Sequence, residues 1–146
     1  MLDDVRVVLD TDVMVAAFVS PGGASRLWLR AALRRAVRML VSVPLMLEYE
    51  AVLLRPDIMR RARAQPAEVE SLLDGVAAAA DHVDISFQWR PSLSDPGDEM
   101  VLEAAVNGRA DAILTFNRRD LAGAARFGIM VETPGMALTR TRIALR

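Results

Sequence analysis

The chain has 146 residues, of which 53% are hydrophobic and 5% aromatic, and its net charge is −1. These values are typical of one compact domain with an aliphatic core, and the overall charge indicates neither a nucleic-acid nor a membrane partner. The chain has no cysteine and one histidine, His82, which excludes disulfides, thiolate zinc sites, iron–sulfur clusters and cysteine nucleophiles. A metal site would therefore use oxygen ligands, which favours Mg²⁺ or Mn²⁺. Because neither a signal peptide nor an apolar run of ~20 residues is present, we expect a cytoplasmic protein without a membrane span.

The first part of the chain alternates between short apolar stretches and helical stretches. Residues 5–9 are rich in β-branched residues and show no alternation, which predicts a buried strand, and residues 38–43 predict a second one. Between these strands we expect a short helix that ends at the Ser-Pro-Gly-Gly stretch 20–23, and a second helix from about Ser25 to about Arg38. After the second strand we expect a helix that begins at Pro44, a basic helical turn within 55–66, and an alanine-rich helix over 66–81.

The second part continues the same alternation. Residues 82–87 predict a third strand at an edge of the sheet, residues 110–116 a fourth and residues 129–133 a fifth. A helix with Asp95 as its cap, Pro96 at its first position and Gly108 at its end precedes the fourth strand, and a short helix within 118–128 follows it. Strands that alternate with helices predict parallel βαβ units. We therefore expect one α/β domain over residues 1–146, with three α/β/α layers and a mostly parallel sheet of four to five strands.

Acidic residues fall where ligands bind in such folds, beyond the carboxyl ends of the strands. The candidates are Asp10 and Asp12 after the first strand, Glu48 after the second, Asp95, Asp98 and Glu99 before the fourth, and Asn117 and Asp120 after it. Taken singly, most of them fit a helix cap or a helix N-terminus equally well, and helical spacing does not distinguish Glu48 from Glu50. Their shared location predicts that they converge.

Converging carboxylates repel one another unless a cation compensates their charge. A divalent ion removes that penalty, polarises a phosphoryl oxygen and lowers the pKa of bound water, which provides a nucleophile without histidine or cysteine. The chemistry that best fits this composition is phosphodiester hydrolysis.

Four stretches, "VVLDTDVMVAAF…SPGGASRL", "LVSVPLMLEYEAVLLRP", "DPGDEMVLEAAVNGRADAILTFNRRDL" and "GIMVETP", resemble the PIN-domain family in order and spacing. The most similar branch is that of the VapC-like ribonucleases, the toxins of toxin–antitoxin pairs. The resemblance covers nearly the whole chain. It implies a parallel sheet between helices, Mg²⁺ or Mn²⁺ at the acids, metal-dependent cleavage of RNA, a homodimer, and inhibition by a cognate antitoxin protein.

The resemblance also assigns roles to individual residues. Asp10 matches the family's first metal-binding aspartate, and Asp98 matches the third acid. Glu48, rather than Glu50, matches the acid of the family's second helix. In this assignment Asp10 and Asp98 bind the ion, while Glu48 and Asp120 position water or a second ion.

Two positions depart from the family pattern. Asp12 stands where relatives commonly have asparagine, and it either shapes the turn or adds a charge. Asn117 stands where many relatives have the fourth acid; its amide oxygen can bind a metal ion without adding charge, and Asp120 is the candidate to replace the missing carboxylate.

Arginines supply all 18 cationic side chains. Those predicted to contact RNA phosphates are Arg26, Arg30 and Arg34, which lie at i+4 spacing and continue to Arg38, together with Arg118 and Arg119. An acidic antitoxin or solvent are the alternative surroundings for them. Trp28 and Trp89 are candidates either for base stacking or for the core, and His82 is expected to be structural.

Two other functions compete with the ribonuclease. The Asp10-Thr11-Asp12 sequence resembles the start of the signature of haloacid-dehalogenase-like phosphatases, with Asp10 as nucleophile, but the lysine that this chemistry uses is absent. A PIN fold with a weakened catalytic site that acts as a binding protein is the second alternative, and Asn117 is its basis.

Overall fold

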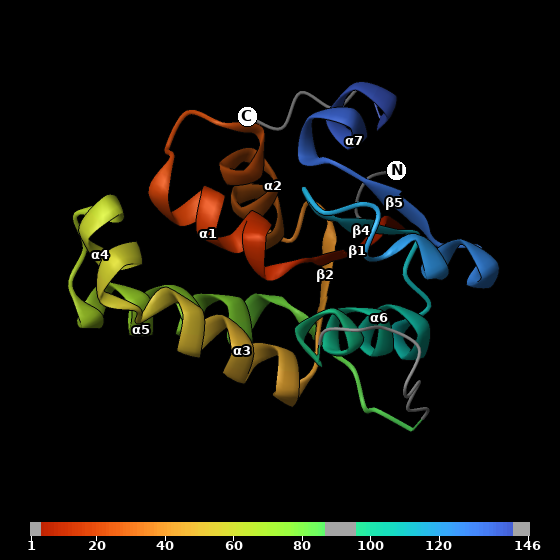
Figure 1. The fold of residues 1–146 in the computed structure, drawn as a ribbon, viewed down its shortest axis with the longest axis horizontal. Coiled ribbons are helices and arrows are strands. Elements are labelled where there is room, and N and C mark those ends of the chain that lie inside the picture. Colours follow the sequence, from red (N-terminus) through yellow and green to blue (C-terminus); the bar gives the residue numbers. More distant parts are fainter. Residues whose placement is uncertain (1–3, 87–95, 142–146) are drawn as a thin grey trace.

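A computed structural model describes residues 4–86 and 96–141. Within them the chain forms a five-stranded, fully parallel sheet with the strand order β3-β2-β1-β4-β5 (Figure 1). The strands are β1 (Arg6–Leu9), β2 (Arg38–Val41), β3 (Asp81–His82), β4 (Ala112–Leu114) and β5 (Met130–Glu132). The predicted α/β class and the parallel sheet are confirmed, and β3 lies at an edge as expected.

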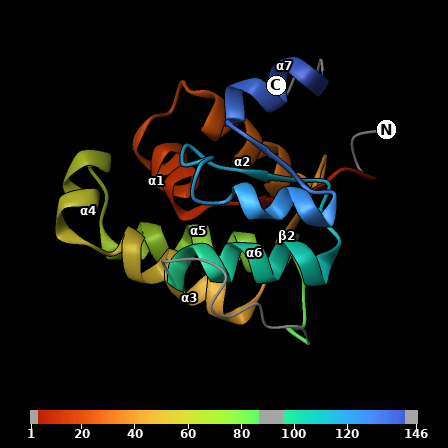
Figure 2. The same cartoon turned by 45° about the vertical axis from the view of Figure 1, so that its right-hand side comes forward.

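Helices cover both faces of this sheet. They are α1 (Thr11–Val19), α2 (Ala24–Leu33), α3 (Val43–Leu53), α4 (Pro56–Ala62), α5 (Pro66–Ala79), α6 (Pro96–Gly108), the 3₁₀ helix η2 (Ala122–Phe127) and α7 (Pro134–Thr141). Helices α1, α2 and α7 lie on one side, and α3, α5 and α6 on the other (Figures 1 and 2). The result is the expected three-layer α/β/α arrangement.

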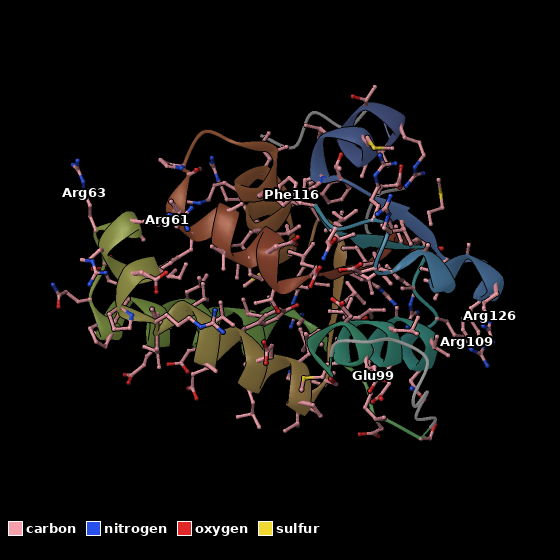
Figure 3. All side chains as sticks on the ribbon, viewed as in Figure 1. Arg61, Arg63, Glu99, Arg109, Phe116 and Arg126 are labelled. Atoms are coloured by element: carbon pink, nitrogen blue, oxygen red, sulfur yellow. The ribbon has the colours of Figure 1, made fainter. Side chains whose placement is uncertain are left out.

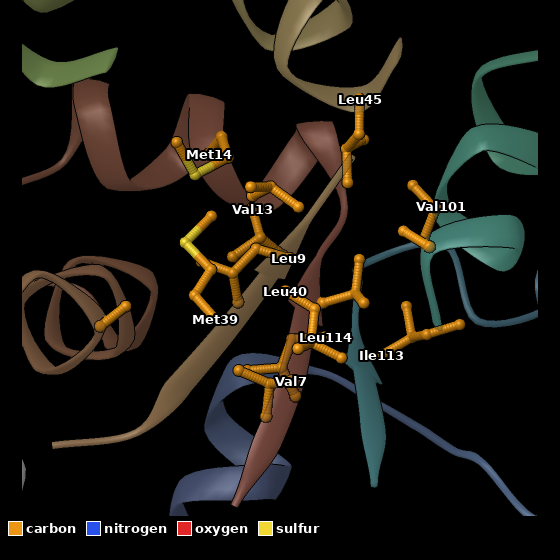
Figure 4. Packing of buried hydrophobic residues seen from close by; sticks show 14 of the residues in the cluster. Val7, Leu9, Val13, Met14, Met39, Leu40, Leu45, Val101, Ile113 and Leu114 are labelled. Carbon is orange, nitrogen blue, oxygen red and sulfur yellow. The ribbon is translucent and has the colours of Figure 1, made fainter. Parts of the chain in front are cut away.

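The core lies around the central strand β1. Val7, Val8 and Leu9 are buried, and Leu9 stands opposite Leu114 of β4 in the parallel register. Figure 4 shows Val7 and Leu9 among apolar side chains from both helical layers and from the neighbouring strands. A strand that is covered on both faces favours apolar residues at consecutive positions, which explains the consecutive buried residues Val7, Val8 and Leu9.

Several predicted boundaries were wrong. Helix α2 ends at Leu33 rather than near Arg38, because Arg35 adopts a left-handed backbone with φ of 59° and starts the turn into β2. The predicted short helix within 118–128 is a turn followed by η2, and Pro44 is the second residue of α3 rather than the first. Helix α7 was not predicted.

The segment with Asp95, the predicted cap of α6, lies outside the described residues. The predicted end of this helix at Gly108 is confirmed. A Cβ added to Gly108 would lie 2.7 Å from Leu40 Cδ1 and 2.9 Å from Val83 Cγ2, so the close packing of α6 on β2 requires glycine at this position.

Among the helices in the described part of the chain, none combines the length and the apolar character that crossing a bilayer requires.

Candidate functional site

The candidate site lies at the carboxyl ends of β1 and β4. Because these strands are paired in parallel with Leu9 opposite Leu114, the residues that follow them, Asp10 and Thr115, lie side by side. Asp10 is buried and caps α1, since its Oδ1 accepts a hydrogen bond from the Thr11 N–H at 2.7 Å. Its Oδ2 accepts a hydrogen bond from the Thr115 hydroxyl at 2.7 Å. Both oxygens of Asp10 are therefore held in fixed positions, as a metal-binding or catalytic carboxylate requires.

Asp12 lies beside Asp10 in the first turn of α1. Its Oδ2 accepts a hydrogen bond from the backbone N–H of Phe116 at 3.0 Å, which connects α1 to the segment after β4. Its Oδ1 is buried and has no hydrogen-bond partner within the described residues. Burial, and next the charge of Asp10, raise the pKa of Asp12 from 3.8 to about 7, although the Phe116 N–H offsets part of this increase.

Tyr49 joins α3 to the same strand end. It is fully buried, and its hydroxyl donates a hydrogen bond to the carbonyl oxygen of Leu9 at 2.5 Å. Burial raises the pKa of the tyrosine well above its ordinary value, and the charge of Asp10 adds to this effect, so Tyr49 stays neutral. Tyr49 was not among the predicted site residues, although its i+4 spacing from Leu45 on the apolar face of α3 was a signal for it.

Glu48 precedes Tyr49 and is half-buried on α3. Asp98 lies in the first turn of α6 and is also half-buried. Helix α3 packs against both α1 and α6. Helix α3, which carries Glu48, therefore lies next to both α1 with Asp12 and α6 with Asp98, and the convergence of these side chains stays a prediction.

Two further acids on α6 are buried. Glu99 is 7% exposed and Glu103, one helical turn later, is 3% exposed; Figure 3 labels Glu99 on α6. Glu99 was predicted only as part of the helix start, and Glu103 was not predicted. The i+4 spacing of these two residues was the signal for a shared helix face.

Asn117 and Asp120 contact each other in the turn after β4. The Asn117 amide Nδ2 donates a hydrogen bond to Asp120 Oδ2 at 2.6 Å. The Asn117 backbone N–H donates to Thr115 Oγ1 at 2.9 Å. A chain of hydrogen bonds thus runs from Asp10 through Thr115 to Asn117.

The metal-binding capacity of these acids can be assessed from their positions. In residues 4–86 and 96–141, no group of three or more Asp, Glu or His side chains is arranged to hold a metal ion. The pair that the structure does bring together is Asp10 and Asp12. Asp10 is buried, and Asp12 is half-buried with one buried oxygen that lacks a hydrogen bond within the described residues, which fits the oxygen-ligand preference of Mg²⁺ or Mn²⁺. The larger ligand set that includes Glu48 and Asp98 stays a prediction.

The arginines differ more than their regular spacing predicts. Arg26 donates hydrogen bonds to the carbonyl groups of Ala17 and Phe18, so it caps the C-terminus of α1. Arg38 is not on the helix but on β2, 3.9 Å from Asp81, and the row of cations therefore stops at Arg34.

The remaining predicted RNA contacts are exposed: Arg30 and Arg34 at α2, and Arg118 and Arg119 in the turn after β4. In Figure 3, Arg61 and Arg63 lie on α4 at the far left, while Arg109 and Arg126 lie at the right. Of these two groups, neither belongs to the elements that carry Asp10 and Asp12.

The aromatic and histidine candidates have structural surroundings. Trp28 is buried and its Nε1 donates a hydrogen bond to the Pro134 carbonyl at 3.0 Å, which confirms the core interpretation. The His82 Nε2 lies 2.7 Å from the Ala77 carbonyl oxygen at the sheet edge. Trp89 lies outside the described residues.

Comparison with known proteins gives one family. The family model with the description "PIN domain" matches residues 6–119, a range that contains β1, Asp10, Asp12 and Asn117. No curated protein shows significant similarity to the chain.

Proposed function

Because the chain belongs to the PIN-domain family, we propose that it is a ribonuclease that depends on Mg²⁺ or Mn²⁺ and is the toxin of a toxin–antitoxin pair. PIN domains are generally nucleases, and such nucleases typically use divalent metals. RNA is proposed as the substrate because the sequence resembles the VapC-like branch. A cognate antitoxin and a homodimer belong to the same proposal.

The observation that supports this function best is the pair of carboxylates, buried Asp10 and half-buried Asp12, at the carboxyl ends of β1 and β4. Asp10 has both oxygens in hydrogen bonds, and Asp12 has a buried oxygen without one. A divalent ion bound there would polarise the scissile phosphate and lower the pKa of a water molecule. Asp10 would hold this ion, with Glu48, Asp98, Asn117 and Asp120 as the further predicted ligands.

The protein's own groups have defined tasks in this mechanism. The Thr115 hydroxyl and the Thr11 N–H keep Asp10 in one orientation, so its oxygens need no rearrangement when an ion binds. Neutral Tyr49 fixes α3 against β1 without adding a charge. Arg118 and Arg119 are exposed next to the site and would bind the phosphates of the RNA backbone.

Cleavage of an end-labelled RNA with and without Mg²⁺ or Mn²⁺ tests the proposal. We expect metal-dependent fragments that are lost with a chelator and with Asp10→Asn. Asp57→Asn is the matched control, because Asp57 is an exposed acid in the first turn of another helix, α4, and its loss should leave cleavage unchanged. Cleavage that persists in the Asp10→Asn variant and in chelator would contradict the proposal.

The toxin role needs a test in cells. Expression of the wild-type chain without a partner should arrest growth, whereas the Asp10→Asn variant should not. If neither the wild type nor the Asp10→Asn variant affected growth, the toxin role would be contradicted. The ribonuclease activity would still be tested by the RNA-cleavage assay.

The alternative of a weakened PIN-fold binding protein is favoured by one observation. Asn117 carries no charge at the predicted fourth metal ligand, and its amide is engaged with Asp120. This alternative predicts RNA binding without metal-dependent cleavage. The phosphatase alternative has no support from the family match, and the chain lacks the required lysine.

A further inference from the structure

We propose that Asp12 is itself a ligand of the divalent ion and supplies the negative charge that Asn117 lacks. This inference rests on the proposed function, because it concerns the ion of the same site. It assigns to Asp12 a role beyond shaping the turn between β1 and α1.

The first argument is the geometry of the Asp12 carboxylate. One oxygen, Oδ2, accepts a hydrogen bond from the Phe116 N–H. This bond holds the side chain in place and connects α1 to the segment after β4. The second oxygen, Oδ1, is buried and has no hydrogen-bond donor within the described residues. A buried carboxylate oxygen without a partner destabilises a fold, so its presence next to Asp10 calls for a compensating group. A cation is such a group.

The second argument is the choice of aspartate over asparagine. An asparagine at position 12 would accept the Phe116 N–H through its amide oxygen and would have N–H donors for a neighbouring carboxylate. It would shape the turn without placing a second negative charge beside Asp10. Aspartate therefore costs stability in the absence of an ion and gains a ligand when an ion binds.

The third argument is the position of Asn117. Its backbone N–H and the Asp10 carboxylate contact the same Thr115 hydroxyl, so Asn117 belongs to the same strand end as the carboxylate pair. It is uncharged, and its amide nitrogen is hydrogen-bonded to Asp120. Asp12 lies at the same strand end and provides a carboxylate there.

The experiment measures Mn²⁺ binding without RNA, by titration calorimetry at pH 8. The variants are Asp12→Asn and the control Asp57→Asn, which also removes an acid from the first turn of a helix. We expect Asp12→Asn to weaken Mn²⁺ binding at least tenfold and the control to match the wild type. Mn²⁺ binding by Asp12→Asn within twofold of the wild type would overturn the inference.

Thermal unfolding distinguishes a metal ligand from a purely structural residue. Without metal, the Asp12→Asn variant should melt at the same temperature as the wild type or higher, because the repulsion from Asp10 is removed. With saturating Mn²⁺, its gain in melting temperature should be smaller than that of the wild type. A variant that melts lower without metal and gains as much from Mn²⁺ as the wild type would show a structural role and overturn the inference.

A double variant tests the charge replacement. Asp12→Asn combined with Asn117→Asp restores the number of acids, so we expect it to recover part of the lost Mn²⁺ affinity. No recovery would overturn the claim that Asp12 replaces a charge at position 117. Because these readouts use no RNA, wild-type Mn²⁺ binding that depends on Asp12, together with absent RNA cleavage, would overturn the proposed function and leave this inference standing.

Discussion

On either side of β4, the neighbouring strands end in buried acids with different surroundings. Glu132 on β5 is 5% exposed, and the Arg140 guanidinium of α7 lies 2.9 and 2.8 Å from its two oxygens. This hydrogen-bonded carboxylate raises the pKa of Arg140. The hydrogen bonds described at Asp10 and Asp12 come instead from neutral donors, namely two backbone N–H groups and the Thr115 hydroxyl.

The comparison distinguishes a structural acid from the acids that we propose to bind the metal ion. The charge of Glu132 is compensated by a side chain of the same protein, so this pair fixes α7 on β5. The hydrogen bonds described above orient the carboxylates of Asp10 and Asp12 through neutral donors, and Asp12 retains a buried oxygen without a donor within the described residues. Such an arrangement is suited to an ion that comes from solution.

The largest expected effect is the loss of activity in Asp10→Asn. The variant keeps the shape of the side chain and its cap on α1 but removes the charge. Since changes to groups that merely orient a metal ligand reduce activity about 10–100-fold, loss of the ligand itself should reduce RNA cleavage by more than about 100-fold. Initial rates of RNA cleavage in Mn²⁺ measure this loss. A rate within tenfold of the wild type would contradict a functional role for Asp10.

The Thr115→Val substitution tests whether the orientation of Asp10 matters for metal binding. The substitution removes the hydroxyl that holds Asp10 Oδ2 and keeps the side-chain volume. We expect Mn²⁺ affinity to fall about 10–100-fold, as is typical for groups that orient metal ligands. Calorimetric titration measures this change, with Thr139→Val as a control, because Thr139 is an exposed threonine of α7 whose hydroxyl donates a hydrogen bond to the Gly135 carbonyl and not to Asp10. Unchanged affinity would mean that Asp10 needs no such support.

The Arg140→Ala substitution tests the structural role of the Glu132–Arg140 pair. It leaves Glu132 buried without its charged donor. Hydrogen bonds to charged groups contribute about 1.5–3 kcal/mol to the free energy of unfolding, and we expect the lower end here because the Arg140 side chain is 40% exposed. We expect a loss of free energy of unfolding of that size in urea denaturation and no change in Mn²⁺ affinity. Arg60→Ala, an exposed arginine of α4, is the control. Weaker Mn²⁺ binding in Arg140→Ala would contradict the distinction between the structural acid Glu132 and the proposed metal ligands.

The smallest expected effect is a pH dependence of stability without metal. The pKa of Asp12 is about 7 in the folded chain and near 3.8 when unfolded, so the folded state binds more protons between these values. Its contribution to stability is therefore greatest at low pH and is lost as the pH rises from about 4 through 7. Relative to wild type, the melting temperature of Asp12→Asn should rise over this interval. A difference that is constant with pH would contradict the raised pKa.

Sequence reasoning succeeded where one residue type determines the local structure. The valine-rich stretch 5–9 located β1 and hence Asp10 at its end, and Pro96 and Gly108 located both ends of α6. It failed where packing decides. Arg34 and Arg35 favour a helix by propensity, yet the chain turns there so that β2 can pair with β1.

The same limit applies to α7 and to the site. The Pro-Gly start of α7 resembles a loop, and the hydrogen bond from Trp28 to Pro134 that fixes it depends on residues 106 positions apart. Asp10 was identifiable from its place after a buried strand. The unsatisfied oxygen of Asp12 depends on the register of β1 against β4, which the sequence does not specify.

The most direct test is a crystal structure of the protein grown with Mn²⁺, with data collected at the manganese absorption edge. The account predicts an anomalous peak within coordination distance, about 2.1 Å, of carboxylate oxygens of both Asp10 and Asp12. A peak that touches Asp10 but not Asp12 would contradict the inference about Asp12. The absence of any peak at this strand end in saturating Mn²⁺ would contradict the central claim.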